Sequence, residues 1–153
     1  MLRMSKMTDY GTMVLAHIAA EPGRIFAASE IAAETKLALP TVRKLLKMLS
    51  KAELVASYRG ASGGYALSRP AEDISAAEIL DALEGPVTLT ECSASDSQCR
   101  LEHSCGVGQS WQHINRLIRQ SLEDVSLTQL CNEHTLTVQF SLGDGLAVRP
   151  ATS

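Results

Sequence analysis

Three clustered cysteines are the residues of this sequence with the most evident chemistry. Cys92, Cys99 and Cys105 lie within fourteen residues, with six and then five residues between them. The intervening residues include Ser, Asp, Gln and Glu, so neither a packed strand nor a packed helix is expected there. A loop that brings three thiolates together is a candidate metal site. The remaining cysteine, Cys131, stands alone, and we expect it to be a small buried residue.

Three kinds of site fit this segment. Thiolates are the usual ligands of iron–sulfur clusters. Structural zinc sites favour cysteines two to four residues apart, so the gaps of six and five are open for zinc. A thiol–disulfide switch without metal is the third alternative, because free cysteines in a polar loop can pair on oxidation.

Features of the chain as a whole narrow the class of protein. The stretch from Met1 to Lys6 lacks the apolar run of a signal peptide, so we expect a cytoplasmic protein, whose reduced thiols favour metal over a disulfide. No apolar run approaches the roughly 18 residues of a membrane span, and no membrane partner is expected. Neither a Ser-His-Asp nor a Cys-His pairing, a phosphate loop or a paired-carboxylate motif stands out. We therefore expect neither an enzyme nor a small-molecule substrate.

Charge is distributed unevenly along the chain, although the formal net charge is only −3. Residues 36–69 contain seven Lys or Arg and one acidic residue, Glu53, whereas residues 75–153 contain four basic and ten acidic residues. A basic block inside an acidic chain indicates a surface for nucleic-acid phosphate. A solvated basic face is the alternative interpretation.

Two helices are expected in and just before the basic block. A short helix over 29–35, a brief break and a second helix over 39–49 give the helix-turn-helix arrangement. Pro40 suits the first turn of the second helix, where its missing N–H costs nothing. The second helix places its apolar residues on one face and its basic residues away from it, as in a helix that reads the major groove. A solvated amphipathic helix would show the same periodicity.

A hairpin follows, with strand-like runs at 54–59 and 65–67 around a glycine-rich tip. A hairpin directly after a helix-turn-helix is a wing, and its small residues allow a close approach to phosphate or to the minor groove. A nucleotide-phosphate loop is disfavoured, because the Gly-Lys-Ser/Thr pattern is absent. The expected DNA contacts are Thr41, Arg43, Lys44 and Lys47 on the second helix, and Arg59, Gly60, Ser62, Gly63 and Gly64 in the wing.

Further helices are expected on both sides of this unit. The first covers residues 10–18, with Ser5 or Thr8 as its cap, and Ser75-Ala-Ala-Glu78 forms a capping box for another. Apolar residues then recur every three to five positions over 107–125, which predicts an amphipathic helix of about twenty residues. Beside a DNA-binding unit such a helix usually forms a dimer interface, because paired half-sites require two-fold symmetry. Packing onto its own domain is the alternative.

The expected fold is mainly α with a small β wing: a winged helix-turn-helix DNA-binding domain plus a long dimerisation helix. We expect the DNA-binding domain at 1–85, the cysteine loop at 86–106, the dimerisation region at 107–133 and a C-terminal tail at 134–153. The alternation of apolar residues over 136–142 suggests a strand in that tail. The expected partners are a double-stranded DNA operator and a second copy of the chain.

With these parts in this order, the chain resembles the IscR/NsrR/RirA family of dimeric winged-helix transcription regulators that carry an iron–sulfur cluster. The specific parts of the resemblance are the start from Leu2 to Tyr10, the wing from Arg59 to Leu67 and the three spaced cysteines. It spans residues 1–133, and the branch that regulates SUF-type cluster assembly is the most similar. The resemblance implies a repressor of those genes that senses iron–sulfur or redox status.

By that resemblance, Cys92, Cys99 and Cys105 are the ligands of a 2Fe–2S or 4Fe–4S cluster. IscR-like members place a histidine three residues after the third cysteine, where this chain has Gly108. NsrR-like members use an aspartate from the start of the partner's first helix, a position that Asp9 matches. Asp9 is therefore the expected fourth ligand, and His103 within the loop is the alternative. Zinc or a thiol–disulfide switch in the same loop of a winged-helix regulator is the competing interpretation.

Overall fold

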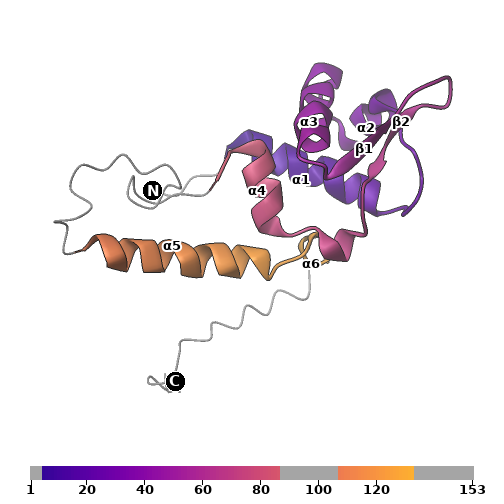
Figure 1. Ribbon diagram of the computed structural model, residues 1–153. Helices are drawn as coiled ribbons and strands as arrows, with labels where there is room; N and C mark the ends of the chain where they lie inside the picture. The colour runs from indigo at the N-terminus through magenta and orange to yellow at the C-terminus, as the bar shows by residue number, and fades with distance from the viewer. Residues whose placement is uncertain (1–4, 87–106, 133–153) are drawn as a thin grey trace, which may run out of the picture.

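The computed structural model describes residues 5–86 and 107–132 of the chain, and its elements are shown in Figure 1. Within these residues the fold is mainly helical with one small antiparallel sheet, as expected. The elements are α1 (Lys6–Ala19), α2 (Ala28–Thr35), α3 (Leu39–Lys51), β1 (Val55–Tyr58), β2 (Gly64–Leu67), the one-turn 3-10 helix η1 (Ala71–Asp73), α4 (Ala76–Leu83), α5 (Gly108–Glu123) and α6 (Leu127–Cys131).

The helix starts follow from local capping chemistry. The Ser5 hydroxyl accepts a hydrogen bond from the backbone N–H of Met7 and caps α1, so the first of the two expected caps is confirmed. Ser75 and Glu78 form the predicted capping box of α4. Pro40 lies in the first turn of α3. A second capping box, between Ser126 and Gln129, opens α6, a helix that the sequence interpretation missed.

The core lies between α1, α2, α3 and α4, and the hairpin closes one side of it. Its largest fully buried side chains are Phe26, Leu15, Ile18, Ile31, Leu45, Leu46, Leu49, Leu54, Ile74, Ile79, Leu127 and Val14. Leu127 comes from beyond the cysteine segment, yet it is 0% exposed. The winged unit and the region after the cysteines therefore share one core.

The hairpin is fastened to the rest of the fold by Phe26. Strands β1 and β2 pair so that Ser57 lies opposite Tyr65. Tyr65 also exchanges two backbone hydrogen bonds of 2.8 Å with Phe26, which therefore acts as a third strand position. A Cβ on Gly64 would lie 2.4 Å from the Phe26 carbonyl oxygen. Glycine at position 64 therefore permits the close approach of these two segments.

Helix α5 lies on the side of the molecule opposite to α3 and the hairpin, with α4 between them (Figure 1). Its C-terminal end is tied to the start of α4 by backbone hydrogen bonds of 2.7 Å, from Ala76 N–H to the Val125 carbonyl and from Leu127 N–H to the Ile74 carbonyl. Arg119 of α5 also forms a bidentate ion pair with Asp81 of α4, at 3.1 and 2.7 Å. Hydrogen bonding to Asp81 raises the pKa of the Arg119 guanidinium, so this contact stays ionised.

Three sequence predictions fall outside the described residues. These are the cysteine loop itself, the strand over 136–142 and the C-terminal tail.

Candidate nucleic-acid interface and cysteine segment

Helix α3 separates its apolar and basic residues as a recognition helix does. Val42, Leu45, Leu46 and Leu49 are fully buried and fix one face against the core. On the other side Arg43, Lys44 and Lys47 are exposed, and Thr41 is partly exposed. None of these three basic side chains pairs with an acidic residue in the part of the chain that the structure describes. Their charges are therefore available to an external anion.

The wing places its predicted contact residues at an exposed tip. Arg59, Gly60 and Ser62 are exposed, whereas Gly63 is partly buried and Gly64 is buried. Gly60 has a φ of +113°, a backbone conformation that favours glycine. A Cβ on Gly63 would lie 2.5 Å from the Tyr58 carbonyl oxygen. Gly63 and Gly64 thus have packing reasons to be glycine, and their contact with DNA stays a prediction.

Not every basic residue of the block at 36–69 has a charge that is free to bind an external anion. Arg69 forms an ion pair with Glu78 and donates a hydrogen bond of 3.0 Å to the Asp73 carbonyl. Burial alone would raise the pKa of Glu78, but hydrogen bonds from Ser75 and Arg69 hold that pKa below its usual range. Arg69 therefore stabilises the start of α4, and its charge is not available to DNA in the way that those of Arg43, Lys44 and Lys47 are.

A cavity of about 400 Å³ lies between α3 and the wing. Two of the predicted DNA contacts, Arg43 and Lys47, line it. The other lining residues, which the sequence interpretation missed, are Ala28, Ser50, Ser57 and Tyr65. The alternation of side chains in a hairpin could have placed Ser57 and Tyr65 on one face, but only the fold brings that face against α3.

Of the predicted cluster ligands, the structure describes Asp9 alone. Cys92, Cys99, Cys105 and His103 lie outside the described residues. Asp9 lies in the first turn of α1, is exposed and has no ion-pair partner among the described residues. Residues 5–86 and 107–132 contain no group of three or more possible metal ligands.

The start of α1 adjoins the point from which the cysteine segment leaves the fold. Glu84, at the end of α4, accepts hydrogen bonds from the Ser5 backbone N–H at 3.2 Å and from the Ser5 and Thr8 hydroxyls. These hydroxyl donors hold the pKa of Glu84 below its usual range. Asp9 follows Thr8 in the first turn of α1, the turn that is bonded to the end of α4 through Glu84.

Helix α5 exposes an apolar stripe in the single chain. Val107, Trp111, Ile114 and Leu117 are 60%, 43%, 39% and 41% exposed, respectively. Apart from Gly108, every residue of α5 is at least partly exposed. The helix contacts α4 through the Arg119–Asp81 ion pair, while these four apolar residues stay exposed. An apolar stripe left open in this way is typical of a protein–protein interface.

Cys131 corrects one prediction. The sequence interpretation expected a buried residue, but Cys131 ends the short helix α6 and is exposed. Partial burial among its neighbours still raises the pKa of its thiol, which lowers the fraction of reactive thiolate.

Among the described helices, none combines the length and the apolar composition that crossing a membrane requires.

Comparisons with known proteins agree with this geometry. A family model described as Rrf2, iron-dependent transcriptional regulator, matches residues 4–133. The HTH-type transcriptional regulator IscR of Sodalis glossinidius (strain morsitans) is 25% identical over 153 residues, which cover 99% of this chain and 92% of that protein. Among solved structures, CymR (YrzC), the global cysteine regulator of B. subtilis, is 28% identical with a TM-score of 0.66, covering 86% of this chain and 97% of CymR. The structure of T. potens IscR is 28% identical with a TM-score of 0.62, covering 84% and 85%.

Proposed function

Because this chain belongs to the Rrf2 family of transcriptional regulators, we propose that it is a homodimeric repressor whose operator binding depends on an iron–sulfur cluster. It is a DNA-binding winged-helix protein and not an enzyme. In this proposal the regulated genes encode SUF-type cluster assembly, and the protein acts in the cytoplasm. The cluster loop at 86–106 links the winged unit at 1–85 to the dimerisation region at 107–133.

The observation that carries DNA binding is the row of unpaired basic side chains on the exposed face of α3, beside the wing. Arg43 and Lys44 lie in one turn and Lys47 in the next turn of a helix whose opposite face is fully buried. A rigidly held helix of this kind can enter the major groove, while the tip of the wing contacts the backbone or the minor groove.

Homodimerisation is supported by the exposed stripe of α5. Since Trp111, Ile114 and Leu117 do not pack onto their own domain, a second copy of the stripe is the proposed partner. A two-fold axis at α5 would present two α3 helices to two half-sites of an operator.

The proposed cluster rests on the chemistry of the donor set. Three thiolates separated by six and five residues suit the ligation of an iron–sulfur cluster, whereas the usual zinc knuckle has cysteines two to four residues apart. Asp9 fits the role of fourth ligand because its carboxylate is exposed and uncommitted, whereas Gly108 supplies no side chain at the position of the histidine in IscR-like members. When bound, the cluster would supply an iron centre that is sensitive to iron shortage and oxidants. Cys92, Cys99 and Cys105 would hold it, with Asp9 or His103 completing the set.

The position of the cysteine loop between the winged unit and α5 supports a sensing role for this loop. The loop at 86–106 begins two residues after Glu84, which is bonded to α1, and ends two residues before the first residue of α5. A change in the segment would therefore act on both α1 and the proposed dimerisation helix. The coupling requires that holo- and apo-protein differ in their arrangement of the two α3 helices.

Mössbauer spectroscopy of anaerobically purified protein tests the cluster, and the Asp9→Ala variant tests its fourth ligand. We expect iron in a cluster for the wild type, and an altered spectrum or a less stable cluster for Asp9→Ala. An unchanged spectrum would favour His103. Protein that carries zinc, or no metal and a peroxide-dependent disulfide, would support the competing interpretations of the loop.

Operator binding gives the second test. Duplexes selected from a random-sequence pool by the wild-type protein provide the operator. Holo- and apo-protein should differ in affinity for it, and equal affinities would contradict the cluster dependence while leaving DNA binding intact.

A further inference from the structure

We propose that the cavity between α3 and the wing is a phosphate slot, in which the recognition helix and the wing bind the same backbone phosphate of DNA. The slot is defined by Arg43, Lys47, Ser50, Ser57 and Tyr65. The proposal rests on the proposed DNA-binding function and adds three hydroxyl-bearing residues to it.

The wall chemistry of the slot matches a phosphodiester. Two cations and three hydroxyls line it, and none of its lining residues is acidic. Arginine and lysine supply charge-assisted hydrogen bonds to phosphate oxygens, and hydroxyls supply further donors. The slot has a volume of about 400 Å³ and is open toward the surface, so a backbone phosphate can reach these side chains.

The polar side chains of the slot are uncommitted. Within the described residues, Arg43 and Lys47 have no ion-pair partner. The hydroxyls of Ser50, Ser57 and Tyr65 likewise make no hydrogen bond to another described residue. An anion that entered the slot would therefore not have to displace an existing protein contact.

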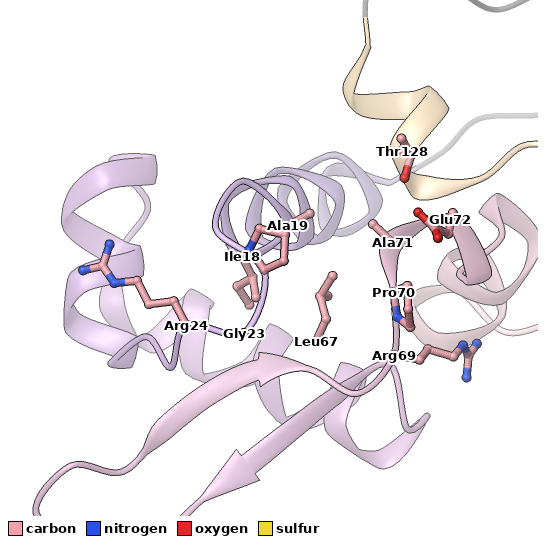
Figure 2. A pocket seen from close by; sticks show the side chains of 11 residues that line it. Ile18, Ala19, Gly23, Arg24, Leu67, Arg69, Pro70, Ala71, Glu72 and Thr128 are labelled. Atoms are coloured by element: carbon pink, nitrogen blue, oxygen red, sulfur yellow. The ribbon is translucent and has the colours of Figure 1, made fainter.

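A second cavity, shown in Figure 2, provides a contrast. It has a volume of about 470 Å³ and is also lined by two arginines, Arg24 and Arg69. Arg24 is bound by Glu21 and Glu30, and Arg69 is bound by Glu78. In Figure 2 both guanidinium groups extend away from the apolar centre of the cavity. Basic residues at that cavity are neutralised by the protein itself, whereas those at the slot are not.

The hydroxyls of the wing are held in place before DNA arrives. Ser57 and Tyr65 are directly opposed across the hairpin, so their side chains share the face that meets α3. Tyr65 is further fixed by its two backbone hydrogen bonds to Phe26, and its ring packs against the core. This preorganisation lowers the entropy that binding must offset.

One shared phosphate would fix the position of α3 and the wing along the DNA. Arg43 and Lys47 belong to the helix that reads the bases, whereas Ser57 and Tyr65 belong to the hairpin. A phosphate held by both would set the register of α3 along the major groove, because backbone contacts orient a protein on the duplex.

The test compares the wild type with the double variant Ser57→Ala and Tyr65→Phe, which removes two hydroxyls and keeps the tyrosine ring. Thermal melting first confirms that the double variant folds. Ethylation interference on the selected operator then scans every phosphate for the one that the slot binds. We expect the double variant to bind roughly ten- to one-hundredfold more weakly, because two hydrogen bonds of ordinary net strength at a solvent-exposed site are removed. Ethylation of one phosphate in each half-site should block the wild type and should weaken binding by the double variant much less, because only Arg43, Lys47 and Ser50 then remain to contact that phosphate.

Lys51→Ala is the matched control, because Lys51 is an exposed cation at the end of α3 that does not line the slot. It should keep the wild-type interference pattern. If the wild type binds DNA and the double variant has the same affinity and pattern, the slot is refuted while the proposed function stands. If the wild type binds no duplex at all, the proposed function itself fails. Competition by inorganic phosphate beyond that of chloride at equal ionic strength, abolished in the double variant, would reassign the slot to a free anion and overturn the proposal.

Discussion

Replacing Ile114 by glutamate should convert the protein from a dimer into a monomer. Ile114 lies at the centre of the apolar stripe of α5 and is 39% exposed in the single chain. Its neighbours on the stripe, Trp111 and Leu117, are 43% and 41% exposed. If a second copy covers this stripe, a charge at position 114 is enclosed in the interface.

The size of the effect follows from the exposed fractions. Full burial of a large apolar side chain is worth roughly 1.5–3 kcal/mol, so a side chain that retains two-fifths of its exposure would gain roughly 0.6–1.2 kcal/mol. Three such residues on each of two copies give roughly 4–7 kcal/mol, which is comparable with the cost of association. An enclosed carboxylate without a partner costs several kcal/mol, and two-fold symmetry introduces two of them. A loss of roughly 4 kcal/mol or more raises the dissociation constant about a thousandfold.

Sedimentation equilibrium at micromolar protein concentration measures this change directly. Gln120→Glu is the control, because Gln120 is an exposed residue on the polar side of the same helix and the substitution introduces the same charge. We expect Gln120→Glu to remain dimeric and Ile114→Glu to be monomeric with an unchanged circular dichroism spectrum. A folded Ile114→Glu protein that dimerises with the wild-type dissociation constant would refute α5 as the interface.

Three further predictions concern the winged unit. Gly64→Ala should lower the free energy of unfolding by about 1–3 kcal/mol in denaturant titrations, because its Cβ would lie 2.4 Å from the Phe26 carbonyl oxygen and the backbone would have to shift. Glu78, whose pKa is lowered by its partners, stabilises the fold above its ordinary pKa of 4.5, and this contribution is lost as the pH falls through the lower pKa of the folded state. Glu78→Gln should therefore melt below the wild type at pH 7, and the difference should shrink on acidification. Lys47→Ala should weaken operator binding and reduce the slope of log K against log salt concentration by about 0.9 for each phosphate that is no longer neutralised; an unchanged slope would exclude binding of phosphate by this residue.

Local chemistry made much of the fold predictable from the sequence. The caps at Ser5 and Ser75, the proline in the first turn of α3 and the alternation in the hairpin each depend on residues a few positions apart. The same holds for the basic face of α3. The periodicity of its apolar residues was sufficient to predict that Arg43 and Lys47 lie away from the buried face. Such signals can be read without knowing what packs against the element.

Features that depend on distant partners were not predictable in this way. The pairing of Phe26 with Tyr65 and the bonding of Glu84 to Ser5 join residues far apart in sequence. Arg69 belongs to the basic block by sequence, but its ion pair with Glu78 removes it from the interface. Cys131 was expected to be buried because isolated cysteines usually are, whereas its position at the end of α6 exposes it.

The burial of Leu127 has a consequence for how the protein is made. Leu127 completes a core whose other buried members all precede residue 84, so α5 and the cysteine segment are translated before that core is full. Removing a buried leucine side chain typically lowers the free energy of unfolding by about 2–5 kcal/mol, which is a large part of the stability of a small domain. A nascent chain therefore reaches its full stability only after the three cysteines have been synthesised. During synthesis, the DNA-binding unit therefore becomes fully stable only after the cysteine segment that is proposed to control it has been made.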